Sequence, residues 1–473
     1  MRWRTTSLLS AVFLAGCSMN PRLDIPVAPV SAAFPGAHAT DPGNAAELHW
    51  REMFPDPRLQ RLIALALNES RDLRIAALNV EAVRAQYRVQ RGAGLPAIEA
   101  TGGYSRQRTP AATAGAAIGG GNTSTGQTGF EFEQFTAQAA LTSFEIDLFG
   151  RLRSQSQAAF ERYLATDEGR RATRISLIGA VADAYVDERL AEEQLKLTQA
   201  TLLDWRSSLE IARRMHAAAQ NSGLDIAQAE GQVSQAEADL EGRRRALAQA
   251  TNALTLLVGS PLPQDLPAPR ALGMQGIRTH LPAGLPSDLL IHRPDIRQAE
   301  HELVAANADV GAARAAFFPR LSLTAALGFS SLALENLFSG GNRAWSFVPQ
   351  ITAPVFQGGQ LRGNLDLAKV RSSIAIASYE RAIQAAFREV ADGLAGRATF
   401  DRQMEAQRRA AASAGARLRL SALRYRAGVD GRLELLDAQR GDFAARGALL
   451  DLQHDSLSNA IGLYRALGGG LIE

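Results

Sequence analysis

Two regions of the chain repeat a pattern of apolar and polar positions that is typical of supercoiled helices. Apolar or small residues advance by alternating threes and fours over 226–257 and again over 433–464, and most members of the second set lie 207 positions after a member of the first. A spacing that averages 3.5 residues predicts helices that wrap around one another. The stretches before these regions are also helical in pattern, and each would form a helix on the order of 100 Å long. The predicted long helices lie at about 151–219, 225–258, 360–426 and 431–467.

The pattern changes to a period of two in four shorter segments. In the third segment Leu321, Leu323 and Leu327 alternate with small or polar residues. This alternation predicts strands, and a length of about ten to twelve residues suits a tilted strand that crosses a membrane. A single segment of this kind would fit a half-buried strand of a soluble sandwich equally well. Four of them in a chain with an export signal favour a membrane barrel, with strands at about 97–108, 134–148, 320–331 and 344–356.

Four strands are too few to enclose a pore. A closed barrel needs about eight strands, and lipid cannot satisfy the hydrogen-bonding groups of an open sheet edge. The chain is therefore expected to oligomerise. Two copies would supply eight strands and a filled interior, whereas three would supply twelve and leave room for a channel, and the strand count leaves both open.

The N-terminus has the features of a bacterial export signal. Arg2 and Arg4 precede a short apolar run that ends in small residues before Cys17, which predicts a signal peptide over 1–16. Cys17 is the only cysteine, so the chain cannot form an intramolecular disulfide. The string Leu-Ala-Gly-Cys resembles the lipobox of bacterial lipoproteins, and this resemblance implies cleavage before Cys17 and acylation of the new N-terminus. By the same resemblance, Ser18 favours delivery to the outer membrane, where two or three acyl chains anchor stably.

Charge and candidate chemistry exclude several functions. The chain has 51 basic and 48 acidic residues, and removal of the signal peptide leaves a net charge of +1, which gives no indication of a nucleic-acid partner. The nearest pair of histidines, His292 and His301, is nine positions apart, which is not a metal-ligand spacing. The sequence has neither a nucleophile elbow nor a phosphate-binding loop. We therefore expect no enzyme activity, no cofactor and no metal site, and any energy must come from a partner.

Several long strings of the sequence run over 285–290, 293–297, 299–300, 305–308, 311–319, 425–430, 435–440 and 463–470. These strings resemble the signature of the outer membrane factors, the TolC-like channels of tripartite efflux systems. Within that family the chain is most similar to the lipoprotein branch that includes OprM and serves resistance-nodulation-division pumps. The resemblance implies a homotrimer with a mixed α and β fold, in which a twelve-stranded transmembrane β-barrel continues into a long periplasmic α-helical coiled-coil barrel.

The internal repeat and this resemblance together predict the domain organisation. Residues 17–56 are rich in proline and are predicted to form a lipidated tether. The first structural repeat is predicted over 57–285 and ends in an equatorial linker at about 259–285. The second repeat is predicted over 286–473 and begins with a further helix. The two repeats form one architecture rather than independent domains.

The turns of the two helical hairpins are the predicted working end of the tube, because a tube that was always open would leak. The first turn lies at Asn221, Ser222 and Gly223. The second turn lies at Ala427, Gly428 and Val429. We expect these tips to contact a periplasmic adaptor, or membrane fusion protein, which links the channel to an inner-membrane pump.

Five residues near the turns are candidates for a gate. Leu433 and Asp437 form an i,i+4 pair on one helical face, and three copies would stack an apolar ring over a ring of carboxylates. The resemblance implies that these two residues form constricting rings. It also implies that Asp225, Arg424 and Tyr425 tie neighbouring helices together in the closed state. The alternative is that Asp437 lies on a solvated face and that Asp225 is a helix N-cap.

The leading functional hypothesis is an exit duct in the bacterial outer membrane that is lipid-anchored and extends into the periplasm. It would conduct small molecules passively from the periplasm to the exterior after the adaptor opens the helical tips. A second hypothesis, with the same fold, is the outer-membrane channel of a protein or peptide secretion system. A third is a lipid-anchored periplasmic coiled-coil scaffold without a pore.

Overall fold

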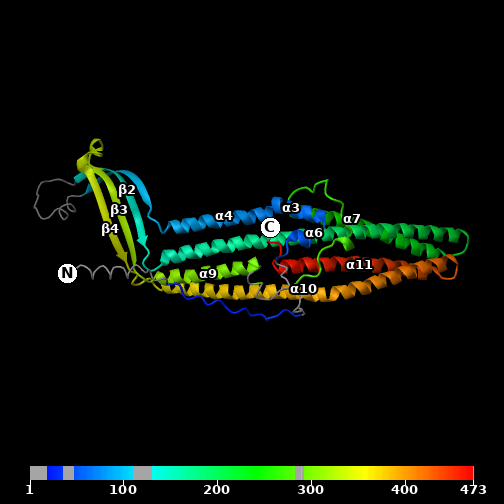
Figure 1. Ribbon diagram of the computed structural model, residues 1–473. Helices are drawn as coiled ribbons and strands as arrows, with labels where there is room; N and C mark the ends of the chain where they lie inside the picture. The colour runs from blue at the N-terminus through cyan, green and yellow to red at the C-terminus, as the bar shows by residue number, and fades with distance from the viewer. Residues whose placement is uncertain (1–18, 36–46, 110–129, 283–288, 290–291, 472–473) are drawn as a thin grey trace, which may run out of the picture. The chain divides into compact units, whose positions relative to one another are not determined.

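The computed structural model describes residues 19–35, 47–109, 130–282, 289 and 292–471 (Figure 1). The predicted signal peptide and Cys17 lie outside the described residues, as does most of the loop between the first two strands. The chain divides into two compact units. We call them the sheet unit (Met1–Ile25, Ala82–Tyr163 and His301–Ile376) and the hairpin unit (Pro26–Glu81, Leu164–Glu300 and Ala377–Glu473).

The sheet unit contains one antiparallel sheet with the strand order β1-β2-β3-β4. Strand β2 begins at Phe130, which pairs with Thr109 at the end of β1. This start is four residues earlier than predicted. Strand β4 ends four residues earlier than predicted, because Pro354 follows shortly and has no N–H group to donate to a ladder. The strands are β1 (Ile98–Thr109), β2 (Phe130–Ile146), β3 (Arg320–Ser331) and β4 (Arg343–Thr352).

The pairing of the strands gives the sheet one apolar and one mainly polar face. Leu327 pairs with Trp345, and Leu321 pairs with Ile351, so these side chains lie on the same face. The opposite face carries polar side chains, and Gln134 Nε2 donates a hydrogen bond of 3.0 Å to Ser330 Oγ across β2 and β3. The apolar face also carries Ile98, Tyr104, Phe135, Leu141, Leu323 and Phe347. In this single chain Trp345 is 76% exposed.

A β-bulge in β2 keeps that apolar face continuous. The register shifts between Leu141 and Phe144, and Ser143 has a φ of 57°. Without the extra residue Phe144 and Ile146 would point to the polar face, because side chains alternate along a strand. The bulge instead pairs Phe144 with Leu323 on the apolar face. The period-two pattern of the sequence did not predict this bulge.

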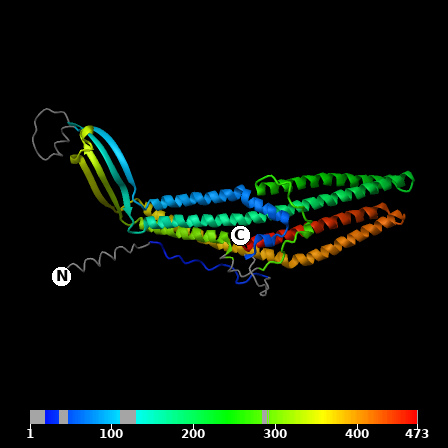
Figure 2. The same ribbon diagram turned by 45° about the horizontal axis from the view of Figure 1, so that its top comes forward.

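Long helices form the rest of the chain, and two of them have the same length of 67 residues. In both views the hairpin α6–α7 lies beside the hairpin α10–α11 (Figures 1 and 2). Among the described residues no helix is both long and apolar enough to cross a membrane. The helices are α2 (Trp50–Met53), α3 (Pro57–Glu69), α4 (Arg71–Gly92), α6 (Arg151–Ala217), α7 (Gly223–Val258), α9 (Pro294–Ala315), α10 (Gln360–Arg426) and α11 (Arg432–Ala466), with short 3₁₀ turns η2 (Leu272–Met274), η3 (Leu334–Asn336) and η4 (Gly340–Asn342).

Left-handed backbone positions recur at one fixed separation in the two halves of the chain. Gly359 lies 209 positions after Gly150, and both precede a long helix with positive φ. The same separation relates Gly468 to Gly259 at the ends of the second helices of the two hairpins. Glycine adopts this conformation without a steric penalty. The helix ends are thus related by 209 positions, two more than the offset read from the heptad pattern.

A break at Ser70 divides the first predicted helical stretch into α3 and α4. Ser70 has extended backbone angles, and its N–H donates to the carbonyl of Ala66. The C-terminal end of α7 packs on this break at Gly259, where a Cβ atom would lie 2.5 Å from the carbonyl oxygen of Glu69. The contact therefore requires a residue without a side chain at position 259.

The segment before α3 is held in the core of the hairpin unit by two tyrosines. Tyr185 donates a hydrogen bond of 2.8 Å to Asp56 Oδ2, and Asp56 Oδ1 caps α3 by accepting from the Arg58 N–H at 2.8 Å. Tyr464 donates a hydrogen bond of 2.6 Å to the carbonyl of Leu48. These contacts join α6 and α11 to the start of the first repeat.

Arg293 connects three helices at the end of α11. Its guanidinium forms a two-pronged ion pair with Asp295, at 2.9 and 2.6 Å, and a further pair with Glu389 of α10 at 2.8 Å. It also donates to the carbonyl of Ala466 at 2.8 Å. These partners hold the pKa of Arg293 above its usual value, although burial works in the opposite direction. Arg293 and Asp295, which belong to the string 293–297, therefore have a structural role where α9, α10 and α11 meet.

A histidine between α6 and α11 should make the stability of the hairpin unit depend on pH. The Asp187 carboxylate, 2.6 Å from His454 Nε2, raises the pKa of His454 to about 9, and Asp455 adds to this. A raised pKa contributes stability that is complete below pH about 6.5 and is lost as the pH rises through 9. We expect the loss to be about 1 kcal/mol between pH 7 and 9.5, because both carboxylates are more than half exposed.

Thermal unfolding followed by circular dichroism across this pH range tests the expectation. His454→Gln should flatten the pH dependence. His280→Gln should change it little, because the contact of His280 with Asp401 is exposed on both sides. Asp183 should not contribute to the change between pH 7 and 9.5, because burial raises the pKa of its carboxyl only to about 6, below that range. An unchanged pH profile in His454→Gln would contradict the assignment.

Candidate functional site

The first hairpin tip is closed by a reciprocal helix cap. After α6 ends, Asn221 Nδ2 donates to the carbonyl of Ala212 at 2.8 Å, which ties the turn back to the last part of α6. Ser222 is the N-cap of α7, and its backbone N–H donates to Asp225 Oδ2 at 2.9 Å while its hydroxyl accepts from the Asp225 N–H. Hydrogen bonds from Ser222 are the main reason why the pKa of Asp225 is lowered. Asp225 is therefore the third residue of a capping box whose N-cap is Ser222, and is not itself the N-cap that the alternative named.

Removing this cap should loosen the first hairpin. Ser222→Ala is expected to cost about 1 kcal/mol, because it leaves amide groups at the start of α7 without an acceptor. Hydrogen exchange of the first-turn amides of α7 measures this loss, and Ser234→Ala, at an exposed position inside α7, should show none. Protection that stayed at the wild-type level would argue against the capping role.

The second hairpin tip is closed by an ion pair within the turn. Arg424 binds Asp430 through two contacts, from Nε at 2.6 Å and from Nη2 at 2.7 Å. Gly428 has a φ of 68°, and the Val429 N–H donates to the carbonyl of Arg424 at 3.0 Å. Val429 is exposed at the tip. Arg424 thus stabilises its own turn, and among the described residues its guanidinium pairs with Asp430 rather than with Asp225 or Tyr425.

Leu433 and Asp437 both lie exposed on the first two turns of α11. Leu433 is 68% exposed to solvent in the single chain. Asp437 forms an ion pair with Arg417 of α10, a partner that the sequence did not reveal. An exposed leucine and an exposed carboxylate one turn apart are available to face other copies of the chain. Their proposed ring arrangement depends on those copies.

Arg432 connects the two hairpins and was missed by the sequence reasoning. It is 4% exposed, donates to Ser208 Oγ of α6 at 2.5 Å and places its guanidinium 5.7 Å from the centre of the Tyr425 ring. Its charge also contributes to the lowered pKa of Asp225. Burial lowers the pKa of Arg432 itself. The structure therefore brings Tyr425 and Asp225 together around Arg432, and only the three-dimensional packing identifies that arginine.

Further contacts between the hairpins lie farther from the tips. The rings of Trp205 in α6 and Phe443 in α11 meet edge to face, with centres 6.1 Å apart. Gln232 of α7 donates a long hydrogen bond of 3.5 Å to Gln439 of α11, and both side chains are buried. These two glutamines are 207 positions apart, which is the offset between the two heptad-patterned regions of the sequence. The contact therefore joins equivalent positions of the two repeats.

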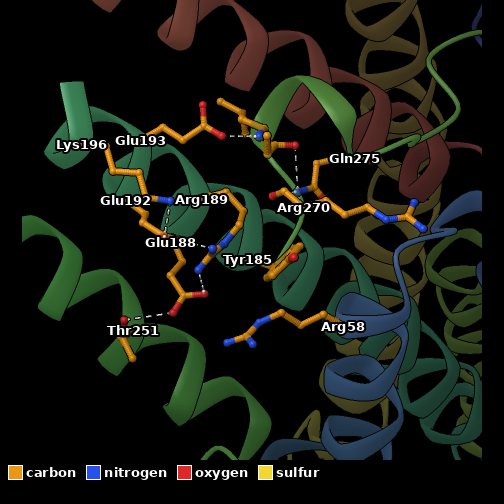
Figure 3. Close-up of polar contacts among 12 residues, drawn as sticks. Arg58, Tyr185, Glu188, Arg189, Glu192, Glu193, Lys196, Thr251, Arg270 and Gln275 are labelled. Atoms are coloured by element: carbon orange, nitrogen blue, oxygen red, sulfur yellow. Dashed lines mark hydrogen bonds and ion pairs between the residues drawn. The ribbon is translucent and has the colours of Figure 1, made fainter. Parts of the chain in front are cut away.

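A polar network fixes the linker after α7 to α6 (Figure 3). Arg189 pairs with Glu188 at 2.8 Å and with Glu192, while Thr251 of α7 donates to Glu188 at 3.1 Å. Glu193 accepts from the Leu272 N–H of the linker at 2.6 Å. The network joins two helices and the linker, so its role is structural.

The described part of the chain can be compared with the expectation that it holds no metal site. No group of three or more histidine, cysteine, aspartate or glutamate side chains within it is arranged to hold a metal ion. Cys17, the predicted lipidation site, lies outside the described residues.

Comparisons with known proteins agree with the fold. Residues 62–260 and 285–469 match the family described as Outer membrane efflux protein. The chain is 44% identical to the toluene efflux pump outer membrane protein TtgC of Pseudomonas putida, over 99% of this chain and 96% of the relative. A membrane protein from Pseudomonas aeruginosa has a similar structure, with a TM-score of 0.88 and 42% identity over 96% of this chain and 100% of that chain. The open state of the Neisseria gonorrhoeae MtrE outer membrane channel gives a TM-score of 0.86 and 40% identity, over 96% of this chain and 99% of that chain.

These similarities confirm several predictions made from the sequence. They confirm the resemblance to the outer membrane factors, the mixed fold of long helices with a four-stranded sheet, and the outer-membrane location. They also confirm a role in efflux and the prediction that the chain is not an enzyme. The chain belongs to the outer membrane efflux protein family.

Proposed function

We propose that the chain forms the outer-membrane exit duct of a tripartite efflux system and conducts small molecules passively from the periplasm to the exterior. The observation that carries the proposal is a sheet with one apolar face whose outer strands, β1 and β4, each pair on one side only among the described residues. Such a sheet is unstable in lipid unless its edges are paired. The helical hairpins supply the part of the duct that extends into the periplasm.

A homotrimer satisfies both sheet edges. Because each chain contributes an even number of antiparallel strands, β4 of one copy can pair with β1 of the next in the same antiparallel sense. Three copies give a twelve-stranded barrel, in which the apolar face with Trp345 and Ile351 contacts lipid and the polar face with Gln134 and Ser330 lines the interior. Similarity to a structure that is named an outer membrane channel supports a pore in this protein.

The hairpin tips form the gate of this duct. Three copies of Leu433 and Asp437 would constrict the tube with an apolar ring and a ring of carboxylates. Tyr425 and Asp225 hold the hairpins together through Arg432, and Arg424 stiffens the second turn. Opening requires the two hairpins to separate at these contacts.

A periplasmic adaptor is proposed to contact the tips and to bring about that separation. The residues available to it are those of the two turns, Asn221, Ser222, Gly223, Ala427, Gly428 and Val429. An inner-membrane pump, of the resistance-nodulation-division type, supplies the energy. Because one relative is named as part of a toluene efflux pump, small apolar organic compounds are the proposed cargo.

Acylation of Cys17 is proposed to anchor each chain in the outer membrane. Cys17→Ser should abolish incorporation of radioactive palmitate while the trimer still assembles, because the strands insert independently of the anchor. Labelling at the wild-type level would contradict the lipobox assignment.

Conductance of the purified protein in planar bilayers tests the duct. Discrete channel steps, together with a trimeric mass in detergent, are the expected results. A pore-free scaffold would give no steps at any voltage, and a monomer in detergent would exclude the shared barrel.

The second candidate, a secretion channel, rests on the same fold. Deletion of the gene should sensitise cells to small organic compounds if the chain serves efflux, whereas loss of a secreted protein from the medium would favour secretion.

A further inference from the structure

The hairpin unit contains a cavity of about 250 Å³ between α6, α10 and α11. Trp205, Leu435 and Phe443 give it an apolar lining, and Gln439 and Asp442 add buried polar groups. The volume is enough for a small organic molecule with one ring. The cavity is distinct from the proposed gate ring, because Asp437 lies exposed and is not part of the lining.

Asp442 is an incompletely satisfied carboxylate in this cavity. Its residue is 6% exposed, and one oxygen, Oδ2, pairs with Arg446 Nε of the next helical turn at 2.9 Å. The other oxygen, Oδ1, is buried and has no hydrogen-bond partner. A buried carboxylate oxygen without a donor costs free energy, so this position favours a ligand that brings one.

The approach of α10 leaves space around that oxygen. Gly415 of α10 faces Asp442, and a Cβ atom at position 415 would lie only 3.2 Å from Oδ1. Glycine therefore keeps a methyl group away from the carboxylate. The aromatic pair Trp205 and Phe443 lies on the same cavity, and aromatic faces attract cations.

We propose that this cavity binds a small organic ammonium compound with an aromatic or apolar body. The ammonium group donates a hydrogen bond to Asp442 Oδ1, and the body packs against Trp205, Leu435 and Phe443. Arg419 and Arg426 also line the cavity, and Arg419 Nη1 would lie 3.7 Å from the same Cβ atom at position 415. Both arginines are exposed, so solvent screens their repulsion of the ammonium group. An occupant would contact both hairpins, since the lining comes from α6, α10 and α11.

Calorimetric titration of the purified full-length protein in detergent tests the proposal with two probes of matched shape. Phenethylammonium carries the charge, and 2-phenylethanol is its neutral counterpart. We expect the ammonium to bind at least tenfold more tightly, because a charge-assisted hydrogen bond to a desolvated carboxylate is stronger than a neutral one. Asp442→Asn should reduce the affinity for phenethylammonium to that of the alcohol. Asp451→Asn, at an exposed position nine residues farther along α11, should change neither affinity.

A second variant keeps the proposal falsifiable if Asp442→Asn disturbs folding. Ala422→Phe places a ring in the cavity from its α10 side and should abolish binding of both probes, while the elution volume and the helical circular dichroism remain those of the wild type. Equal affinities for the two probes, retained selectivity in Asp442→Asn, or retained binding in Ala422→Phe would each overturn the proposal. Absence of binding to the wild-type protein would mean that water alone satisfies Asp442, and would overturn it as well.

Discussion

Replacing Arg293 with methionine is expected to lower the free energy of local unfolding at the end of α11 by about 3 kcal/mol. Methionine keeps an apolar stem but removes the charge that pairs with Asp295 and Glu389. It also leaves the carbonyl of Ala466 without its donor. Hydrogen exchange of the amides at the start of α9 and the end of α11 measures the effect.

An exposed arginine provides the matched control for this substitution. Arg278 forms a surface ion pair with Glu52 at 3.7 Å, and both side chains are more than half exposed. Arg278→Met should therefore change the free energy of unfolding by less than about 0.5 kcal/mol. An equal effect of the two substitutions, or a loss below about 1 kcal/mol for Arg293→Met, would contradict the role of Arg293 as the connection between three helices.

Replacing Asp437 with asparagine is expected to raise the single-channel conductance and to weaken block by a trivalent cation such as La³⁺ about tenfold or more. Three carboxylates around a narrow axis bind cations together, which favours block by a trivalent cation and slows the exit of permeating cations. The substitution removes all three charges without changing the shape of the side chain. Planar-bilayer recordings with La³⁺ added on the periplasmic side measure both quantities.

Arg417 gives a control that should change the block in the opposite direction. Arg417 pairs with Asp437 and neutralises part of its charge. Arg417→Gln should therefore strengthen block by La³⁺, whereas Glu434→Gln, at a neighbouring exposed position, should have little effect. If Asp437→Asn left conductance and block unchanged, Asp437 would lie on a solvated outer face and the carboxylate ring would not exist.

The candidate site was predictable from the sequence to the extent that its residues lie in the turns. The turn at Gly428 and the caps near Ser222 follow from local preferences of glycine and serine, which do not depend on distant parts of the chain. Arg432 was not predictable, because its importance comes from burial against Ser208 and Tyr425, which belong to two other helices. The pairing of Asp437 with Arg417 likewise depends on how α10 and α11 pack.

Taken by itself, the sequence determined which segments are strands and which are long helices, because a period of two and a spacing of 3.5 residues are local properties of the chain. It also determined that the sheet has an apolar face, since alternation fixes which side chains share a side. Only the tertiary structure decided the bulge that returns Phe144 to that face, the break at Ser70, and the burial of Arg293, Arg432 and Asp442. These features depend on contacts between residues far apart in the sequence, and no local pattern specifies which charged side chain such a contact will bury.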